Sequence, residues 1–175
     1  MSATSRLYTV QALPTGKVSI AQRPRGGDWL IDDIKMLAFD GVEILVSLLT
    51  PDEIAESDLT KEAEICQQQG IIYLSYPLRD LSTPLFSAKT FALLNQLKTS
   101  LVEGKHVAAH CYMGLGRSAL IAASVLVLSG FSPKHACAQL SCVRGYTVPE
   151  MEAQRAWVEE LPQRYKDFSR APEET

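Results

Sequence analysis

The sequence of 175 residues contains no run of basic residues, no long uninterrupted apolar segment and only three histidines. Its lysines and arginines are scattered and its formal net charge is -3, which argues against a surface that binds nucleic acid or acidic lipid. His106 and His135 lack metal-ligand spacing to cysteines or acidic residues, so we assign both to the surface and expect no metal or other cofactor. Any anion site must therefore be local.

The longest nearly uncharged stretch, residues 107–131, does not have the pattern of a membrane span. Arg117 and the glycines at 114 and 116 interrupt it. About 14 residues remain after the arginine, a length typical of a buried helix. The first residues, MSATSRLYTVQALP, lack the basic start and apolar stretch of a secretory signal, so we expect a cytoplasmic protein. Its four cysteines are then expected to be reduced thiols.

Length and composition favour one ordinary globular domain. Hydrophobic residues make up 46% of the chain and charged residues 21%, so neither a disordered nor a fibrous protein is indicated. We expect a single domain over residues 1–175, with a core of about residues 7–166, a frayed tail at 167–175 and a monomeric state.

Short apolar runs alternate with segments of helical period along the whole chain. Strands are predicted in the runs LYTVQAL, KVSIAQ, EILVSLL, IIYLSYPL and KHVAAH, the first two forming a hairpin around Gly16. Helices are predicted within residues 23–41, once or twice within 50–70, at 87–104, at 118–129, from Pro133 to near Gly145, and from Pro149 toward Tyr165. The helix at 118–129 is apolar on every side and is therefore expected to be central. This alternation predicts an α/β fold, a central and mostly parallel sheet with helices on both faces.

The motif HCYMGLGRS, residues 110–118, lies between a predicted strand and the apolar helix. A glycine-containing loop that opens onto a helix binds anions, because its N–H groups point inward and the helix dipole is positive there. Five residues separate Cys111 from Arg117, enough for a tight loop to surround a tetrahedral oxyanion while the guanidinium closes it with two parallel hydrogen bonds. The same positive field favours the thiolate of Cys111, so the motif predicts a nucleophile that attacks phosphorus. A buried, purely structural cysteine is the alternative.

The other cysteines provide an internal comparison. Six residues after them come Ile72, Val143 and Val148, so Cys111 alone has a partner arginine at this spacing.

A phosphate ester that is attacked by a thiolate needs an acid to protonate the leaving oxygen. Asp80, in the segment YPLRDLSTP, follows a predicted parallel strand and stands in a turn-prone stretch flanked by prolines. The carboxyl ends of parallel strands face the same edge of the sheet, so Asp80 is the predicted acid. The alternative is that its side chain only caps a local turn.

These segments carry a family likeness. HCYMGLGRS resembles the His-Cys-x5-Arg-Ser/Thr signature of the cysteine-dependent protein tyrosine phosphatases, and YPLRDLSTP resembles the general-acid loop of their dual-specificity branch. Within that branch, GIIYLSYPLRDLSTP and the apolar helix resemble the kinase-associated (cyclin-dependent kinase inhibitor type) phosphatases. The resemblance extends over most of the chain and implies a protein tyrosine phosphatase-like fold.

The resemblance also implies a role for each residue of the motif. Cys111 would form a phosphocysteine intermediate, Arg117 would bind the phosphoryl oxygens, and Asp80 would protonate the leaving group and then activate water. Ser118 would ease expulsion of the thiolate, and His110 would help to set the ionisation of the cysteine. The backbone N–H groups that would cradle the phosphate are those of Tyr112, Met113, Gly114, Leu115 and Gly116.

The implied activity is hydrolysis of phosphotyrosine, with phosphoserine and phosphothreonine as further candidates. The implied partner is a phosphorylated protein, because the loop lacks the lysines of phosphoinositide-specific relatives. Two other functions remain open: a phosphate-dependent binding protein or pseudophosphatase, and a phosphatase of a non-protein ester. Sulfur or arsenate chemistry on a rhodanese-like fold is disfavoured by the separate acid Asp80.

A few positions depart from the family pattern or admit a simpler interpretation. Met113 stands where close relatives carry glycine, so we expect it to alter the pocket floor or what lies behind it. Leu48 lies where some relatives keep a second cysteine, and Cys66 is a poor substitute, so no protective disulfide is predicted. We interpret Gln154 as an exposed helical residue, although it could resemble a water-positioning glutamine. Trp29 is expected to pack in the core.

Overall fold

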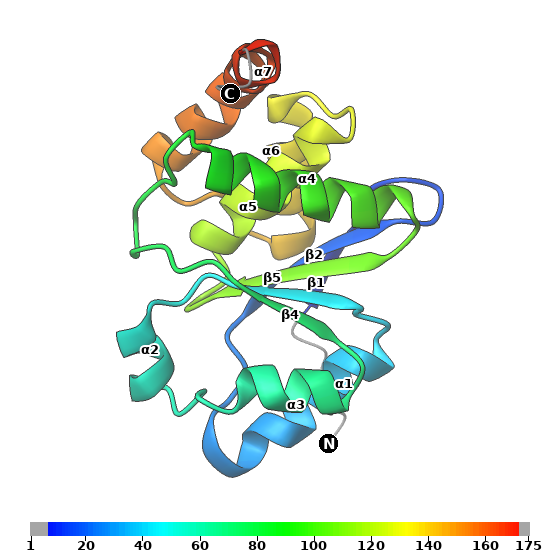
Figure 1. Cartoon of the computed structure of the whole chain (residues 1–175), viewed down its shortest axis with the longest axis vertical. Coiled ribbons are helices and arrows are strands. Elements are labelled where there is room, and N and C mark those ends of the chain that lie inside the picture. Colours follow the sequence, from blue (N-terminus) through cyan, green and yellow to red (C-terminus); the bar gives the residue numbers. More distant parts are fainter. Residues whose placement is uncertain (1–6, 172–175) are drawn as a thin grey trace.

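Five strands form one sheet in the order β1-β2-β5-β3-β4 in the computed structural model, which describes residues 7–171 (Figure 1). The strands are β1 (Leu7–Gln11), β2 (Lys17–Gln22), β3 (Ile44–Ser47), β4 (Ile72–Ser75) and β5 (His106–Cys111). Strand β1 pairs antiparallel with β2, and the remaining neighbours are parallel. The predicted hairpin and the predicted mostly parallel sheet are confirmed.

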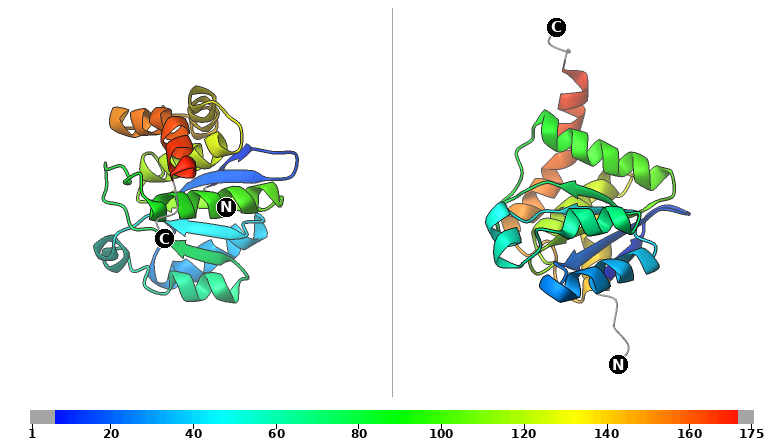
Figure 2. Two further views of the ribbon diagram at one scale, coloured as in Figure 1. Left: turned by 45° about the horizontal axis from the view of Figure 1, so that its top comes forward. Right: turned by 60° about the horizontal axis from the view of Figure 1, so that its bottom comes forward.

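Helices cover both faces of this sheet, as the alternating pattern predicted. They are α1 (Leu30–Phe39), α2 (Pro51–Glu56), α3 (Glu62–Gln68), α4 (Ala88–Val102), α5 (Arg117–Leu128), α6 (Pro133–Arg144) and α7 (Glu152–Arg170). Helices α4 and α5 lie on one face with α6 and α7, whereas α1 and α3 lie on the other (Figures 1 and 2). Each face encloses its own cluster of buried apolar side chains.

The helix starts follow from local sequence. Thr50 caps α2 as half of a capping box with Glu53, and Pro51 takes the first helical position. Ser87 and Ser132 accept hydrogen bonds from the first-turn N–H groups of α4 and α6. Helix α5 differs, because it begins after Gly116 with no side-chain cap. Its first N–H groups are therefore left for another acceptor.

Helix α5 is the centre of the larger core, as its apolar sequence predicted. All of its residues from Arg117 to Val127 are buried, and it contacts β2, β5, α4, α6 and α7. A helix that is packed on every side holds its first turn rigidly at the carboxyl end of β5. The fold thus fixes both ends of the loop that joins β5 to α5.

Two local expectations are wrong. The last helix begins at Glu152 rather than Pro149, which lies in the bend before it, and the helix continues past Tyr165 to Arg170. Trp29 does not pack in the core: it is 57% exposed, and the Arg25 guanidinium stacks 4.6 Å from its ring. The expected frayed tail is helical to Arg170, and residues 172–175 lie outside the described residues.

Candidate active site

The loop between β5 and α5 joins Cys111, the last residue of its strand, to Arg117, the first residue of its helix. Gly114 adopts a φ of 70° and lies so close to β2 that a Cβ there would be 2.8 Å from backbone atoms of Ala21. A Cβ on Gly116 would be 3.0 Å from the side chain of Gln154. The two glycines therefore allow the tight turn that the spacing predicted.

Cys111 is buried at the base of this loop, and its Sγ lies 3.2 Å from Oγ of Ser118. Ser118 is also buried, in the first turn of α5. The hydroxyl can donate a hydrogen bond to a thiolate, which makes the sulfur a better leaving group when it is expelled from phosphorus. The sulfur also lies at the uncapped start of α5, where the helix dipole favours negative charge.

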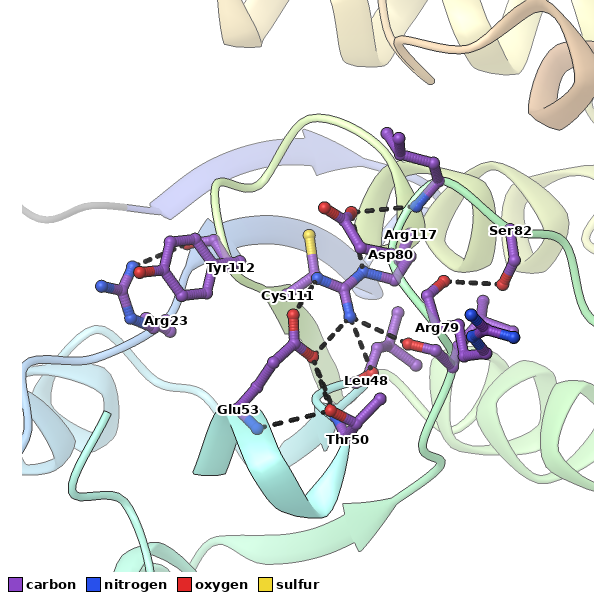
Figure 3. Close-up of polar contacts among 12 residues, drawn as sticks. Arg23, Leu48, Thr50, Glu53, Arg79, Asp80, Ser82, Cys111, Tyr112 and Arg117 are labelled. Carbon is purple, nitrogen blue, oxygen red and sulfur yellow. Dashed lines mark hydrogen bonds and ion pairs between the residues drawn. The ribbon is translucent and has the colours of Figure 1, made fainter. Parts of the chain in front are cut away.

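The guanidinium of Arg117 is buried and held from below by Glu53 of α2 (Figure 3). Nη1 and Nη2 donate to the two carboxylate oxygens of Glu53 at 2.8 and 2.9 Å. Nη1 also donates to the carbonyl of Leu78 at 2.8 Å. Glu53 is a site residue that the sequence does not reveal, because the capping pattern at Thr50 marks it as a helix residue and gives no sign of its contact with the loop.

The charges of this cluster support one another. Burial alone would lower the pKa of Arg117, but the hydrogen bonds to Glu53 and the neighbouring charges of Cys111, Glu53 and Asp80 raise it above its ordinary value. Burial alone would raise the pKa of Glu53, but its hydrogen bonds with Arg117 and Thr50 lower it. Arginine and glutamate therefore remain a charged pair, and the guanidinium has a fixed orientation.

Two donors of Arg117 are left for a ligand. Among the described residues, Nε has no hydrogen-bond acceptor, and Nη2 uses only one of its two hydrogens on Glu53. In a planar guanidinium, the Nε hydrogen and the second Nη2 hydrogen are parallel, so they can bind two oxygens of one tetrahedral anion. These two donors face away from Glu53 and are available for the two-bond clamp that the motif predicts, which stays a prediction.

Asp80 lies on the opposite side of the Arg117 guanidinium from Glu53 (Figure 3). Its Oδ1 is 3.5 Å from Nε of Arg117, and its side chain is 63% exposed. The same oxygen accepts the N–H of Leu81 at 2.9 Å, and Leu81 has a φ of 61°. The carboxylate of Asp80 thus stabilises the local turn and also lies at the arginine of the anion loop, and its role as the acid stays a prediction.

The segment that carries Asp80 is fixed to helix α7 on its far side. Trp157 donates to the carbonyl of Pro84 at 2.8 Å, and its ring stacks on Phe86 with centroids 4.4 Å apart. Gln154 donates to the carbonyl of Ser82 at 3.3 Å. The interpretation of Gln154 as an exposed residue is wrong, because its side chain is buried between this segment and Gly116.

Comparisons with known proteins identify the family of this chain. The sequence profile described as "Polymorphic toxin system, DSP-PTPase phosphatase" matches residues 20–131, which is more than half of the chain. The chain belongs to the dual-specificity phosphatase family. It is similar to the cyclin-dependent kinase inhibitor 3 of Rattus norvegicus, 30% identical over 115 residues, and of Mus musculus, 32% identical over 114 residues. Each match covers 65% of this chain and 54% of the relative, so the chain spans about half the length of these curated relatives.

Solved structures of phosphatases share the fold. Kinase associated phosphatase, with its catalytic-site cysteine replaced by serine, matches with a TM-score of 0.83 over 95% of this chain and 98% of that one, at 21% identity. Tk-PTP in the active form matches with a TM-score of 0.72 over 94% and 99% of the two chains, at 22% identity. These identities establish the protein tyrosine phosphatase-like fold and nothing finer. The expected family and fold class are confirmed.

The rim of the phosphatase loop consists of large exposed side chains. The Arg23 guanidinium lies 3.6 Å from the ring centroid of Tyr112 and donates to the carbonyl of the same residue at 3.2 Å. Met113 is 50% exposed, so its side chain belongs to this rim and not to the pocket floor, and an effect on what lies behind the floor stays a prediction. Leu115 is partly buried and packs against the larger core.

Arg144 of α6 supports the same loop from behind, a contact that no local pattern in the sequence indicates. Its Nε donates to the carbonyl of Gly114 at 3.1 Å, and Nη2 to that of Met113 at 3.3 Å. With these two carbonyls bound behind the loop, the loop N–H groups are free to point toward an anion. The arginine is buried and stacks on Tyr8, 4.4 Å from its ring centroid.

The histidines lie away from the anion loop. Alternate residues of a strand face opposite sides of the sheet, so the His110 side chain lies on the α3 side while Cys111 belongs to the core on the α5 side. His106 is buried and bonded to Oγ of Ser19 at 2.6 Å, so its assignment to the surface is wrong. Burial lowers its pKa. His135 is exposed, as expected, and its ring stacks on Phe131.

The four cysteines are free thiols, and Cys66 is buried in the smaller core on the α1 and α3 side. Its burial, with the charge of Glu62, raises the pKa of Cys66 to about 12. Within residues 7–171 no group of three or more His, Cys, Asp or Glu side chains is arranged to hold a metal ion. None of the helices described combines the length and apolar character needed to cross a membrane.

Proposed function

We propose that the chain hydrolyses phosphotyrosine in proteins through a phosphocysteine intermediate on Cys111, with phosphoserine and phosphothreonine as further substrates. The observation that carries the proposal is the convergence of four groups on one loop. The Cys111 sulfur, the Ser118 hydroxyl, two unused donors of Arg117 and the Asp80 carboxyl all meet at the uncapped start of α5. A metal-independent phosphatase needs a nucleophile, a site for the phosphoryl charge and an acid, and these groups supply all three.

In the first step the Cys111 thiolate attacks phosphorus, forming the S–P bond as the ester P–O bond breaks. Arg117 and the N–H groups of residues 112–116 stabilise the charge on the phosphoryl oxygens. Asp80, entering as the carboxylic acid, gives its proton to the leaving oxygen. Its high exposure and its position at the arginine support this role, because the leaving group departs toward solvent.

In the second step a water attacks phosphorus, the Asp80 carboxylate takes its proton, and the S–P bond breaks to release inorganic phosphate. The hydroxyl of Ser118 stabilises the departing thiolate. Gln154 is buried beside Gly116 and bound to the Asp80 segment, which supports a role in orienting the water. His110 acts at a distance, through the strand that carries Cys111.

A phosphorylated protein is the proposed substrate class. The printed names of the relatives, kinase associated phosphatase and cyclin-dependent kinase inhibitor, support it. The loop has no lysine that would favour a phosphoinositide. We propose further that residues 7–171 act as one monomeric phosphatase domain in the cytoplasm.

The test is turnover of p-nitrophenyl phosphate and of a phosphotyrosine peptide. Cys111→Ser is expected to abolish both activities while still binding the phosphopeptide, and Cys142→Ser, at an exposed cysteine, to keep them. Activity that persists in Cys111→Ser would exclude the mechanism. A wild-type protein that binds the phosphopeptide without turnover would be a binding protein instead. Binding of Cys111→Ser to a panel of phosphopeptides and phosphoinositides distinguishes a protein substrate from a non-protein substrate.

A further inference from the structure

A carboxylate that the proposed reaction does not use is buried beside the imidazole of His110, behind the strand that carries Cys111. Nε2 of His110 lies 2.7 Å from Oε1 of Glu62, the first residue of α3. Each side chain is 1% exposed. A buried carboxylate is costly unless it is paired, so each of these two side chains needs the other.

The pair has few other polar contacts. Among the described residues, neither ring nitrogen of His110 has a partner in hydrogen-bond geometry, so the imidazole has only the 2.7 Å approach of its Nε2 to Oε1 of Glu62. The Tyr73 hydroxyl of β4 donates to Oε2 of Glu62 at 3.5 Å, and Cys66, one turn further along α3, faces the same carboxylate. Burial, reinforced by the charge of Glu62, raises the pKa of Tyr73 to about 12, as it does for Cys66.

This arrangement is a poor way to stabilise a core. Replacing two buried polar partners with apolar side chains of similar shape can be neutral or stabilising, so stability alone does not explain the contact. Its location suggests a different purpose, because His110 directly precedes Cys111. The imidazole is the point at which α3 can hold the end of β5.

The backbone of His110 connects this point to the arginine clamp. Its carbonyl accepts the N–H of Leu48 at 3.0 Å, and the Leu48 carbonyl accepts the N–H of Leu78 at 3.0 Å and faces Nη1 of Arg117 at 3.5 Å. A rotation of His110 would therefore move the start of the anion loop and one of the carbonyls that face the guanidinium. A displacement of 1 Å at such a place can cost a reaction about 10²-fold in rate.

We propose that Glu62 is a positioning residue for the phosphatase reaction: its carboxylate holds the His110 imidazole on the α3 side of the sheet and so fixes the base of the Cys111 loop. The inference rests on the proposed function for its effect on turnover. Its effect on loop geometry can be measured without turnover.

Three variants isolate the contact. Glu62→Gln keeps an oxygen that can accept from Nε2 of His110, Glu62→Leu removes it, and Cys66→Ala is the matched control on the same buried face of α3. Relative to wild type, and corrected for the folded fraction from thermal unfolding, kcat/KM is expected to fall about 10²-fold in Glu62→Leu. Glu62→Gln and Cys66→Ala are expected to stay within about threefold of wild type, less than the loss of one hydrogen bond to a charged group. If Glu62→Leu does not fold, the double variant Glu62→Leu/His110→Leu leaves no unpaired buried charge and is expected to show the same loss.

The second readout is alkylation of Cys111, followed by peptide mass spectrometry at fixed pH. Iodoacetate is an anion that the loop should attract, whereas iodoacetamide is neutral. The ratio of the iodoacetate rate to the iodoacetamide rate at Cys111 therefore reports on the anion-binding geometry of the loop. The same ratio at Cys142, which lies outside the loop, is the reference. The ratio at Cys111 is expected to exceed that at Cys142 in wild type and Glu62→Gln, and to fall toward it in Glu62→Leu or the double variant. The inference would be overturned if the ratio at Cys111 were unchanged in folded Glu62→Leu or in the folded double variant. It would also be overturned if the ratio fell equally in Glu62→Gln. A wild type without phosphatase activity would overturn the proposed function and leave this readout intact.

Discussion

The two terminal nitrogens of Arg117 and the two carboxylate oxygens of Glu53 form paired hydrogen bonds of 2.8 and 2.9 Å. This end-on contact uses the side of the guanidinium that faces away from the anion loop and leaves the Nε side without a hydrogen bond, with Oδ1 of Asp80 3.5 Å from Nε. Glu53 thereby fixes the orientation of the long Arg117 side chain and of its Nε and Nη2 donors before a ligand binds.

Glu53→Gln should lower activity through this contact. Glutamine keeps the capping box of α2 with Thr50 but offers the guanidinium only one acceptor oxygen. We expect kcat/KM for p-nitrophenyl phosphate to fall about 10²-fold, because the clamp is no longer oriented. Glu56→Gln, at an exposed position of the same helix, should retain wild-type activity. Equal activity in the two variants would show that Glu53 does not orient the arginine.

Glu53 should also give the fold a pH dependence in acid. Its pKa in the folded chain is lower than the ordinary value of 4.5, so its contribution to stability is fully present above pH 4.5 and is lost as the pH falls through the folded value. In urea denaturation at pH 7, the free energy of unfolding should therefore be larger for wild type than for Glu53→Gln. This difference should become smaller below about pH 4.5. A difference that is constant with pH would mean that the carboxylate charge does not stabilise the folded state.

Asp80→Ala should slow poor leaving groups most. Phenyl phosphate needs its leaving oxygen protonated, and removal of a general acid costs about 10²-fold or more in kcat. p-Nitrophenyl phosphate should lose much less, because its phenolate leaves without a proton. Asp28→Ala, at an exposed aspartate, serves as the control for both esters. Equal losses on the two esters in Asp80→Ala would remove Asp80 from the acid role.

Gln154→Ala should affect the second chemical step. The buried amide lies beside Gly116 and is bound to Ser82, so its loss leaves the attacking water with one orienting group fewer. Loss of one hydrogen bond of about 1 kcal/mol corresponds to roughly a fivefold slower step. We expect a lower steady-state rate with an unchanged or larger initial burst of p-nitrophenol. Gln163→Ala, on the exposed side of the same helix, should leave both unchanged, and an equally slowed burst in Gln154→Ala would exclude a role confined to hydrolysis.

The sequence predicted the parts of the site that local rules determine. Cys111, Arg117 and Ser118 are linked by a short loop whose ends are a strand and an apolar helix, so their proximity follows from spacing alone. Asp80 was predicted from the rule that the carboxyl ends of parallel strands share an edge. The sheet and most helices followed from alternation, caps and period.

The residues that hold these groups were not predictable in the same way. Glu53 meets Arg117 across 64 positions of sequence, and Arg144 reaches Gly114 across 30. Their local patterns, a capping box and an amphipathic helix, are satisfied without those contacts. Gln154 and His106 were misassigned because a polar side chain on a helix or strand is usually exposed, whereas here tertiary hydrogen bonds stabilise it in a buried place.

The phosphocysteine itself is the most direct test of the proposed reaction. Wild-type protein and Asp80→Ala would be mixed with p-nitrophenyl phosphate, quenched in acid within milliseconds and digested for mass spectrometry. We predict one added phosphoryl group on the peptide that contains Cys111, formed at the rate of the p-nitrophenol burst and absent from Cys111→Ser. Turnover without this adduct, or with the phosphoryl group on another residue, would contradict covalent catalysis at Cys111.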